Sequence, residues 1–358
     1  MPTLPELRRY ALRRSLFRPT TLERAILKLG FVQADPLRAP ARAQDLTLFQ
    51  RVKNYRAGDL ERRYAELAVE EDFFINYGFL ARPFHALMHP RSGFERYPRA
   101  RAKKAEQILA FVREHGPVHP REVERVLGSG TERHWSGNSN VTTRLLDALH
   151  YRGFLRVARR DTGIRVYAPA NPSARIDGDD DATLDALIDV AFRKYAPVTA
   201  SSLWQLIYRL RFAVPQWRTQ LKPALARAQR RLASSELDGV TWYWPAAERV
   251  LARADDDEEP VVRILGPFDP VVWDRRRFEH FWNWAYRFEA YTPVKQRVRG
   301  YYALPLFWGE HAIGWANLTH ADRLLTTSFG YVSGKAPRDA RFKRGLDAEI
   351  ARFERFLR

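Results

Sequence analysis

Gln33 and Asp35 are the two residues of this sequence whose types and spacing are best suited to chemistry. They lie in the stretch GFVQADPLRAPARAQ (Gly30–Gln44), which follows a helix-like run and begins like a buried strand. In an extended chain, residues i and i+2 point to the same face at roughly 7 Å, so both side chains would aim at one point. Asp35 precedes Pro36, which favours an extended conformation. A carboxylate beside an amide could form a site, or simply the solvated face of an edge strand.

Histidines supply a second candidate. His85 and His89 have the i, i+4 spacing of a zinc-binding pair on a helix. The residue after His85 is not Glu, and no third ligand lies nearby in the sequence, so we expect a structural or surface role for this pair. The sequence also lacks cysteine, a glycine-rich phosphate loop and a nucleophile elbow. We therefore predict neither a metal nor a cofactor.

The charge balance points to a polyanionic partner. The 358 residues include 60 Lys and Arg against 42 Asp and Glu, which gives a net charge of +18. Such a balance suits nucleic acid or an anionic membrane surface, although a coding bias towards arginine contributes to it. No apolar run approaches the length of a membrane span, and the arginine-rich N-terminus has no continuous apolar core that would mark a secretory signal. We expect a cytoplasmic protein that does not enter a membrane.

A short pattern recurs three times and suggests what positions these residues. Each copy follows an amphipathic run, breaks it with proline and opens another helix, as in FRPTTLE (Phe17–Glu23), HGPVHPREV (His115–Val123) and YAPVTASSL (Tyr195–Leu203). In the first copy, Thr20 and Glu23 have capping-box spacing, and Gly30 is expected to end the helix. The pattern indicates a helix-turn-helix arrangement, repeated along the chain.

The middle copy shows most clearly which element comes after the helices. NVTTRLLDALHYRGFL (Asn140–Leu155) predicts a helix with Leu145, Leu146 and Leu149 on its inward face. The next stretch, LRVARRDTGIRVYA, alternates around Asp161–Gly163 and predicts a hairpin. Helices and then a hairpin make a winged helix, and all three copies are compatible with that arrangement.

We therefore predict an α+β fold of four modules. Winged helix 1 spans residues 1–100 and contains the strand with Gln33, winged helix 2 spans 101–170, and winged helix 3 spans 183–248. Acidic stretches at Pro169–Thr183 and Ala252–Pro260 are expected to be solvated linkers. Residues 260–358 are strand-rich with Gly and Pro breaks before a last helix, which predicts a small β-barrel or curled sheet.

Basic side chains beside the predicted helix ends and wings are candidates for phosphate contacts. For any single arginine a solvated surface is the more common role, so the prediction rests on the whole set together with the net charge. The candidate DNA-binding residues are Arg38, Arg42, Gln44, Arg51, Arg144, Arg152, Arg159, Arg160, Arg275 and Arg276, with Arg277 beside them.

Several of these stretches resemble one known family. QADPLRAPARAQDLTLFQR (Gln33–Arg51), RGFLRVARRDTGIRVY, GPFDPVVWDRRR and YYALPLFWGEHAIGWANLTHADR are similar to the winged-helix DNA glycosylases of the YcaQ/AlkZ type. The resemblance covers nearly the whole chain and keeps the order of the modules. It implies three tandem winged helices and a C-terminal β-barrel in a C shape around DNA.

The resemblance also assigns roles. The family signature of Gln, an apolar residue, then Gln or Asp implies that Gln33 and Asp35 are catalytic and places this chain in the Asp-bearing branch. Tyr77 stands where the family pattern suggests His. The implied activity is hydrolysis of the N-glycosidic bond of N7- or N3-alkylated purines, including bases in interstrand crosslinks, during DNA repair. The expected partner is damaged double-stranded DNA, bound by a nucleoid-associated monomer.

The residue chemistry is consistent with that activity. Alkylation at N7 makes a purine a cationic leaving group, so an enzyme has mainly to stabilise an oxocarbenium-like sugar and deliver water. An ionised Asp35 could do both, and the Gln33 amide could hold the water or the sugar. The alternative is a non-enzymatic winged-helix DNA-binding protein such as a transcriptional regulator, which would need no acidic residue aimed at DNA.

Overall fold

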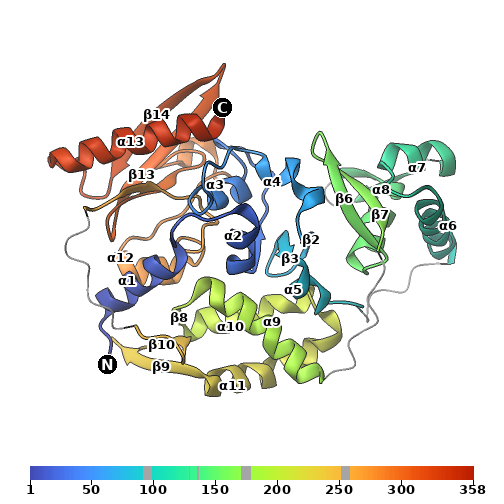
Figure 1. The fold of residues 1–358 in the computed structure, drawn as a ribbon, viewed down its shortest axis with the longest axis horizontal. Helices are drawn as coiled ribbons and strands as arrows, with labels where there is room; N and C mark the ends of the chain where they lie inside the picture. Colours follow the sequence, from blue (N-terminus) through green and yellow to red (C-terminus); the bar gives the residue numbers. More distant parts are fainter. Residues whose placement is uncertain (92–98, 129, 135–136, 171–178, 251–258) are drawn as a thin grey trace.

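The computed structural model describes residues 1–91, 99–128, 130–134, 137–170, 179–250 and 259–358. Figure 1 shows four groups of elements along the chain: an N-terminal group at the centre, a second group on one side, a third group below, and a C-terminal sheet with its helix on the other side. Most of both predicted acidic linkers lies outside the described residues.

The N-terminal group carries the short strand that ends at Gln33. Its second helix begins after Thr21, whose side chain accepts the Arg24 N–H, and ends at Gly30, which has a φ of 70°. The cap is therefore Thr21 rather than the predicted Thr20, and the predicted end at Gly30 is confirmed. The elements are α1 (Leu4–Ser15), α2 (Leu22–Leu29), β1 (Phe31–Gln33), α3 (Ala43–Phe49), α4 (Asp59–Arg62), η1 (Tyr64–Glu66), β2 (Val69–Phe73), β3 (Tyr77–Ala81) and α5 (Arg82–Ala86).

Strand β1 is held against the rest of this group by β3. The sheet order is β1-β3-β2 with antiparallel pairs, and Gln33 lies opposite Gly78. A Cβ atom at Gly78 would lie 2.3 Å from the Val32 carbonyl oxygen and 2.5 Å from the Phe31 ring. Only glycine therefore fits at position 78, where β3 pairs with β1. This close approach fixes the backbone that carries Gln33.

The second group contains the helix and hairpin that the sequence predicts. Helix α8 starts after Asn140, whose side chain accepts the Thr142 N–H, and its buried face includes Leu145, Leu146 and Leu149. The following hairpin turns at Thr162 and Gly163, which both have positive φ. Both predictions are confirmed. The elements are α6 (Arg99–His115), α7 (Pro120–Leu127), β4 (Thr131–His134), β5 (Gly137–Asn140), α8 (Val141–Tyr151), β6 (Leu155–Asp161) and β7 (Ile164–Pro169).

The third group repeats helices followed by a hairpin. Thr199 ends its short first strand, and its side chain accepts the Ser202 N–H at the start of the next helix. The elements are α9 (Asp180–Tyr195), β8 (Val198–Thr199), α10 (Ala200–Arg209), η2 (Leu210–Phe212), η3 (Pro215–Gln220), α11 (Leu221–Arg231), β9 (Leu232–Leu237) and β10 (Val240–Pro245).

The three groups share one strand order. In the N-terminal and third groups the first strand pairs with the last strand of the hairpin, which gives the orders β1-β3-β2 and β8-β10-β9. In the second group a bridge between Val118 and Tyr167 places Val118 beside β7 in the same way. This topological repeat differs from the sequence pattern in its first copy, because FRPTTLE opens α2 before β1, whereas the other two copies open α7 and α10 after the first strand or bridge.

The C-terminal group is an antiparallel sheet in the order β11-β12-β13-β14. Among the described residues β11 does not pair with β14, so the sheet stays open rather than closing into the predicted barrel. Helix α13 packs against β11. Figure 1 shows this helix beside the C-terminal sheet. The elements are β11 (Val262–Ile264), α12 (Arg275–Trp282), η4 (Val294–Gln296), β12 (Leu304–Trp308), β13 (His311–Ala321), β14 (Leu324–Tyr331) and α13 (Ala340–Leu357).

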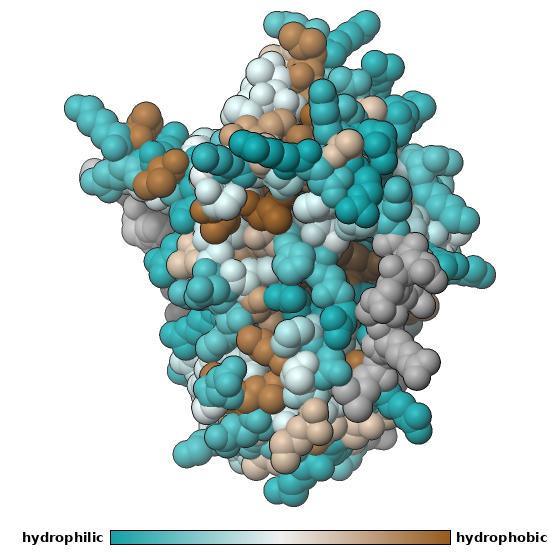
Figure 2. Space-filling view, turned by 90° about the vertical axis from the view of Figure 1, so that its left-hand side faces the viewer, coloured by the Kyte–Doolittle hydropathy of each residue, from teal (hydrophilic) through white to brown (hydrophobic). Residues whose placement is uncertain are grey.

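The surface agrees with the strongly charged composition. Figure 2 shows one face on which hydrophilic residues dominate and apolar residues form small, separate patches. In the described part of the chain no helix combines the length and apolar character of a transmembrane span.

A buried ion pair joins the N-terminal and C-terminal groups. Arg51 and Asp269 have no exposed side-chain surface, and the guanidinium binds both carboxylate oxygens at 2.7 and 2.9 Å. Arg51 also donates to the carbonyl oxygens of Ser15 and Thr47 at 2.8 and 2.7 Å. Four of its five N–H groups donate inside the protein and the side chain has no exposed surface, so Arg51 does not reach a phosphate in this structure, which contradicts its predicted role in DNA binding.

We expect Arg51→Ala to lower the free energy of unfolding by about 3–5 kcal/mol, because it leaves the Asp269 carboxylate buried without its counter-ion. Arg276→Ala is the matched control; Arg276 is exposed, so its loss should change stability by no more than about 0.5 kcal/mol. Chemical denaturation of the three proteins measures both values. A loss below about 1 kcal/mol for Arg51→Ala would contradict this account of the ion pair.

Candidate active site

Gln33 is held in one orientation by two side chains from distant parts of the chain. It is 6% exposed, and its amide oxygen accepts hydrogen bonds from Asn76 Nδ2 at 2.9 Å and Trp273 Nε1 at 3.0 Å. An indole N–H can only donate, so this contact identifies the oxygen of the Gln33 amide. Both lone pairs are occupied, and the NH₂ group has no partner within the described residues.

Asp35 follows β1 but is not part of it. Pairing with β3 continues as far as the Ala34 N–H, which donates to the Tyr77 carbonyl at 3.0 Å. Asp35 Oδ1 then accepts the Leu37 N–H at 2.9 Å and turns the chain away from the sheet. This is the side chain-to-backbone bond that aspartate often makes in turns, and the chain bends at Pro36.

The two residues therefore border different hollows rather than one shared face. Asp35 lines a cavity of about 790 Å³ together with Ala34, Tyr77 and residues of α8 and the β6–β7 hairpin. Gln33 lines a second cavity of about 710 Å³ together with Asn76, Trp273 and residues of α10. β1 ends at Gln33, so the two side chains do not both project from this strand, although only Ala34 separates them.

Asp35 is the acidic residue that its cavity leaves unpaired. The other two carboxylates lining it are engaged, since Asp72 binds Arg91 at 2.8 Å and Asp147 binds Arg165 at 2.6 Å. Within the described residues no cation neutralises Asp35. Burial raises the pKa of Asp35 above its ordinary value, and the hydrogen bond from Leu37 partly offsets this shift.

Tyr302 adds a polar group close to this carboxylate. Burial, with a smaller contribution from the Asp35 charge, raises the pKa of Tyr302, so its phenol remains protonated. The buried hydroxyl has no hydrogen-bond partner among the described residues. A carboxylate that is not neutralised, in an open hollow, can stabilise positive charge or accept a proton from water.

Comparison with known proteins identifies the family. The family model of AlkZ-like DNA glycosylases matches residues 26–356. The chain belongs to this family. A solved structure, the DNA glycosylase AlkZ of Streptomyces sahachiroi, has a similar fold, with a TM-score of 0.64 and 14% sequence identity over 99% of this chain and 96% of that one.

Membership confirms the prediction of an enzyme that acts on DNA. This AlkZ-like protein is a DNA glycosylase of DNA repair, and the alternative of a non-enzymatic regulator is not supported. The family match begins before β1 and so includes Gln33 and Asp35. Their catalytic roles remain predictions of the sequence.

Some predicted DNA contacts gather around the Asp35 cavity of this AlkZ-like glycosylase. Arg42, Gln44, Arg144 and Arg160 all line it. Arg42 binds Glu61, and Arg160 donates to both carboxylate oxygens of Glu71 at 2.8 and 2.6 Å, so these two guanidinium groups are partly engaged. Gln44 is 3% exposed, and its amide oxygen has no partner in the described structure.

The remaining predicted contacts divide into exposed and buried residues. Arg38, Arg159 and Arg276 are exposed, and Arg276 borders the Gln33 cavity. Arg152 is partly buried. Arg275 also borders that cavity, but its guanidinium donates to the carbonyl oxygens of Val272 and Pro267.

Arg277 is fully buried in this glycosylase. Its guanidinium donates to the carbonyl oxygens of Tyr195, Pro197, Pro270 and Val271. Like Arg51, it cannot contact DNA in this conformation and serves to hold the fold together.

Sequence reasoning missed the groups that surround the two candidate residues. Asn76 and Trp273 orient Gln33, and nothing in the local pattern connects Trp273 with a strand 240 positions earlier. Tyr77, at the position where the family pattern suggests His, donates to Glu71 at 2.8 Å and lies under the Arg165 guanidinium at 4.4 Å. Burial raises the pKa of Tyr77 well above its ordinary value, so this residue is not a general base.

We expect Asp35→Asn to raise the free energy of unfolding at neutral pH by no more than about 1 kcal/mol, since partial solvation limits the effect. The pKa of Asp35 is raised in the folded protein, so ionisation of this carboxyl opposes folding. The difference should vanish below the pKa of the unfolded chain, where the wild-type carboxyl is protonated in both states. It should reach its full size above the folded-state pKa.

Denaturation of wild type and Asp35→Asn across the acidic to neutral range tests this expectation. Asp147→Asn is the matched control from the same cavity, and it should lower stability because it removes the partner of Arg165. An Asp35→Asn protein that is less stable than wild type at neutral pH would show that the carboxylate stabilises the fold.

Proposed function

We propose that this glycosylase hydrolyses the N-glycosidic bond of N7- or N3-alkylated purines in DNA and that Asp35 supplies the catalytic carboxylate. The observation that carries the proposal is the unpaired state of Asp35 in a chain of net charge +18. The other carboxylates of the same cavity have cationic partners, and Asp35 does not. A partly buried charge without a partner opposes folding, which favours a functional role for it.

The proposed reaction uses the positive charge of the substrate. Cleavage of the bond between C1′ and the purine nitrogen sends the electron pair to the base, which leaves as a neutral molecule. Asp35 stabilises the cationic sugar that develops and accepts a proton from the water that adds to C1′. The raised pKa of Asp35 makes this carboxylate a better base than an ordinary aspartate. The logic resembles glycoside hydrolysis with one carboxylate in place of two.

Gln33 is proposed to act as a hydrogen-bond donor. Asn76 and Trp273 occupy its amide oxygen, so only the NH₂ group can meet the sugar, the water or a phosphate. Because Gln33 and Asp35 border separate hollows, we place the reacting nucleotide over Ala34, between the two. The amide then positions one side of the substrate, and the carboxylate acts on the other.

DNA is proposed to bind across the three helical groups as winged helices arranged in a C around the duplex. The shared order of the first strand and hairpin supports the winged-helix interpretation and the predicted boundaries at residues 100, 170 and 248. Contacts to phosphate are assigned to the arginines of the predicted set that are exposed or partly exposed and do not donate only to backbone carbonyls, which are Arg38, Arg42, Arg144, Arg152, Arg159, Arg160 and Arg276. We further propose that the enzyme acts as a nucleoid-associated monomer.

Asp35→Asn should reduce base release by about 100- to 10,000-fold, because the substitution keeps the shape of the side chain and removes its charge. Affinity for the duplex should stay the same or rise slightly, since a negative charge near the phosphates is lost. Release of free base from duplex containing N7-methylguanine measures the first effect, and a binding titration measures the second.

Asp147→Asn, in the same cavity, should keep base release within about tenfold of wild type, since its carboxylate is already engaged by Arg165. The rate of base release by Gln33→Ala should lie between the rates of these two variants, because the Gln33 amide positions the substrate but supplies no charge. Wild-type rates in Asp35→Asn would place the catalytic group elsewhere.

We also expect a selective substrate range, in which the enzyme releases cationic alkylpurines from DNA but does not release uracil. Uracil leaves as an anion and needs donors that stabilise its oxygens, whereas the Asp35 carboxylate would repel it. Interstrand crosslinks through N7 should be processed, because the Asp35 cavity is open and its volume of about 790 Å³ leaves room for a bulky adduct.

Duplexes carrying uracil, N7-methylguanine or an N7-linked crosslink, compared side by side, test this range. Excision of uracil as fast as N7-methylguanine would rule out the cationic leaving-group mechanism. Failure on the crosslink alone would restrict the substrate class to single adducts.

A further inference from the structure

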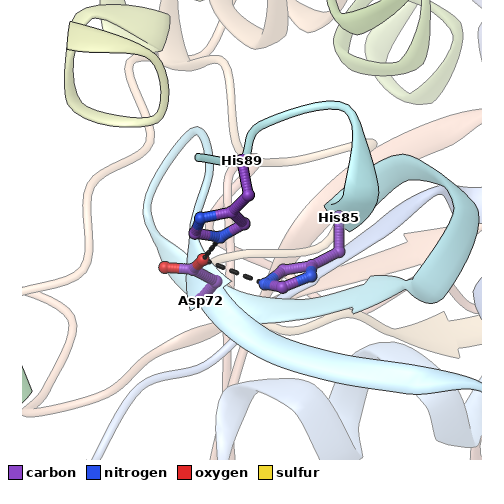
Figure 3. Close-up of side chains that lie close together, drawn as sticks. All are labelled: Asp72, His85 and His89. Carbon is purple, nitrogen blue, oxygen red and sulfur yellow. Dashed lines mark hydrogen bonds and ion pairs between the residues drawn. The ribbon is translucent and has the colours of Figure 1, made fainter. Parts of the chain in front are cut away.

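The fold brings a third ligand to the histidine pair of the sequence. His85 lies in α5, His89 follows it, and both Nε2 atoms approach the same oxygen of Asp72, which comes from β2. The distances to Asp72 Oδ2 are 3.1 Å from His85 and 2.9 Å from His89 (Figure 3). No third ligand lies near the pair in the sequence, but Asp72, 13 positions before His85, reaches it because β2 folds beside α5.

We propose that Asp72, His85 and His89 form a binding site for a divalent transition metal ion of the zinc type. The three donor atoms lie within 4.8 Å of one another. Bonds of about 2.0–2.2 Å to one zinc ion place neighbouring ligand atoms roughly 3.3 Å apart, so small side-chain adjustments convert this trio into three sides of a tetrahedral site. Two imidazole nitrogens and one carboxylate oxygen suit zinc, cobalt or nickel better than calcium or magnesium.

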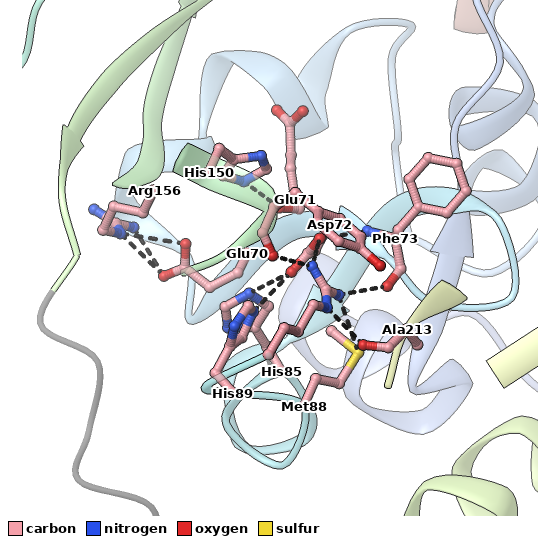
Figure 4. Close-up of polar contacts among 12 residues, drawn as sticks. Glu70, Glu71, Asp72, Phe73, His85, Met88, His89, His150, Arg156 and Ala213 are labelled. Carbon is pink, nitrogen blue, oxygen red and sulfur yellow. Dashed lines mark hydrogen bonds and ion pairs between the residues drawn. The ribbon is translucent and has the colours of Figure 1, made fainter. Parts of the chain in front are cut away.

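The surroundings of Asp72 direct one carboxylate oxygen to the histidines. Asp72 Oδ1 accepts the Arg91 guanidinium at 2.8 Å and the Phe73 N–H at 2.6 Å, which leaves Oδ2 for the metal (Figure 4). Outer hydrogen bonds of this kind fix a ligand in place before the ion binds. Asp72 is 1% exposed, so this orientation does not depend on solvent.

The side of the site away from Arg91 has space for further coordination. His85, His89 and Glu70 line a small cavity of about 140 Å³. Gly153 borders this cavity and allows the His89 ring to approach closely, since a Cβ atom there would lie 2.6 Å from His89 Nδ1. Water in this cavity could complete the coordination and meet the His89 Nδ1 atom, which has no partner among the described residues.

The competing account is a metal-free cluster in which both neutral imidazoles donate Nε2–H to Asp72. That arrangement directs two donors at one oxygen and leaves the buried His89 Nδ1 atom without a partner. A metal ion replaces both of those hydrogens with one cation, while the small cavity borders the His89 ring in either account. The two accounts differ in whether the protein binds metal.

The place of Asp72, His85 and His89 in the fold favours a structural role for the proposed metal ion. Arg91, which holds Asp72, also donates to the carbonyl oxygens of Tyr151 at 2.6 Å and Ala213 at 2.5 Å. The cluster therefore lies where the N-terminal, second and third groups meet (Figure 4). Asp72 also borders the Asp35 cavity, but both histidine ligands line the small cavity and not that one, so we assign the ion to this junction rather than to base release.

The test uses the full chain, stripped with a chelator and dialysed, and titrated with Zn²⁺ and then Co²⁺ in the absence of DNA. We expect one Zn²⁺ per chain, a visible d–d absorption band with Co²⁺, and a rise in Tm on the order of 5 °C with excess Zn²⁺. His85→Ala and His89→Ala should each weaken Zn²⁺ binding by more than about 100-fold. His311→Ala, which removes an exposed histidine of β13, is the matched control and should bind like wild type.

Wild-type protein that binds no stoichiometric Zn²⁺ and shows no Co²⁺ band would overturn the proposal, whatever the variants do. Equal binding by wild type, His85→Ala and His89→Ala would overturn it as well, because the ion would then lie elsewhere. Poor folding of either variant leaves the wild-type titration and Co²⁺ spectrum as the deciding measurements. None of these readouts involves DNA or base release, so their failure is distinguishable from failure of the proposed glycosylase mechanism.

Discussion

The buried pair of Arg51 and Asp269 is the constraint on which the candidate site depends. It ties the end of α3 to the loop before α12, and that loop carries Trp273, whose backbone N–H donates to the Asp269 carbonyl at 2.8 Å. The Trp273 indole then fixes the amide of Gln33. The ion pair between the N-terminal and C-terminal groups is thus linked, through the loop that carries Trp273, to the orientation of the Gln33 side chain. Precise positioning of this kind requires supporting contacts outside the site itself.

Much of the excess of arginine is used inside the protein. Arg160 and Arg156 of the β6–β7 hairpin bind Glu71 and Glu70 of β2, so the second group is attached to the N-terminal group by paired charges. Arg91 connects the same strand to the third group. Guanidinium groups suit such junctions because each can meet several oxygens in a fixed plane. The net charge of the chain therefore overstates how many arginines are available to DNA.

Local patterns predicted the local structure well. The leucines of α8 and the turn at Thr162 and Gly163 follow from periodicity and turn chemistry, which depend only on neighbouring residues. The strand predicted for Gln33 is present, but it ends before Asp35, where a side-chain hydrogen bond to the Leu37 N–H belongs to a turn that the pattern did not indicate.

Long-range contacts were beyond such reasoning. Trp273 reaches Gln33 across 240 positions, and the burial of Arg51 depends on Asp269 in another part of the chain. Arginines are usually exposed, so Arg51 was assigned to the surface by default. Likewise, the histidine pair at 85 and 89 gained a third ligand only when β2 folded beside α5. The family resemblance indicated the activity but none of these contacts.

The shared topology of the three helical groups shows how chemistry can be added to a repeated scaffold. In the second and third groups, the residue at the end of the first strand or directly after it, His119 or Thr199, caps the following helix. In the N-terminal group residues 34–42 intervene between β1 and α3, and Asp35 lies within them. The longer connection in the N-terminal group therefore leaves Asp35 without the helix-capping role that His119 and Thr199 have in the other two groups. Under the role that we propose for Asp35, one of three similar groups would carry the reactive residue without a change of fold.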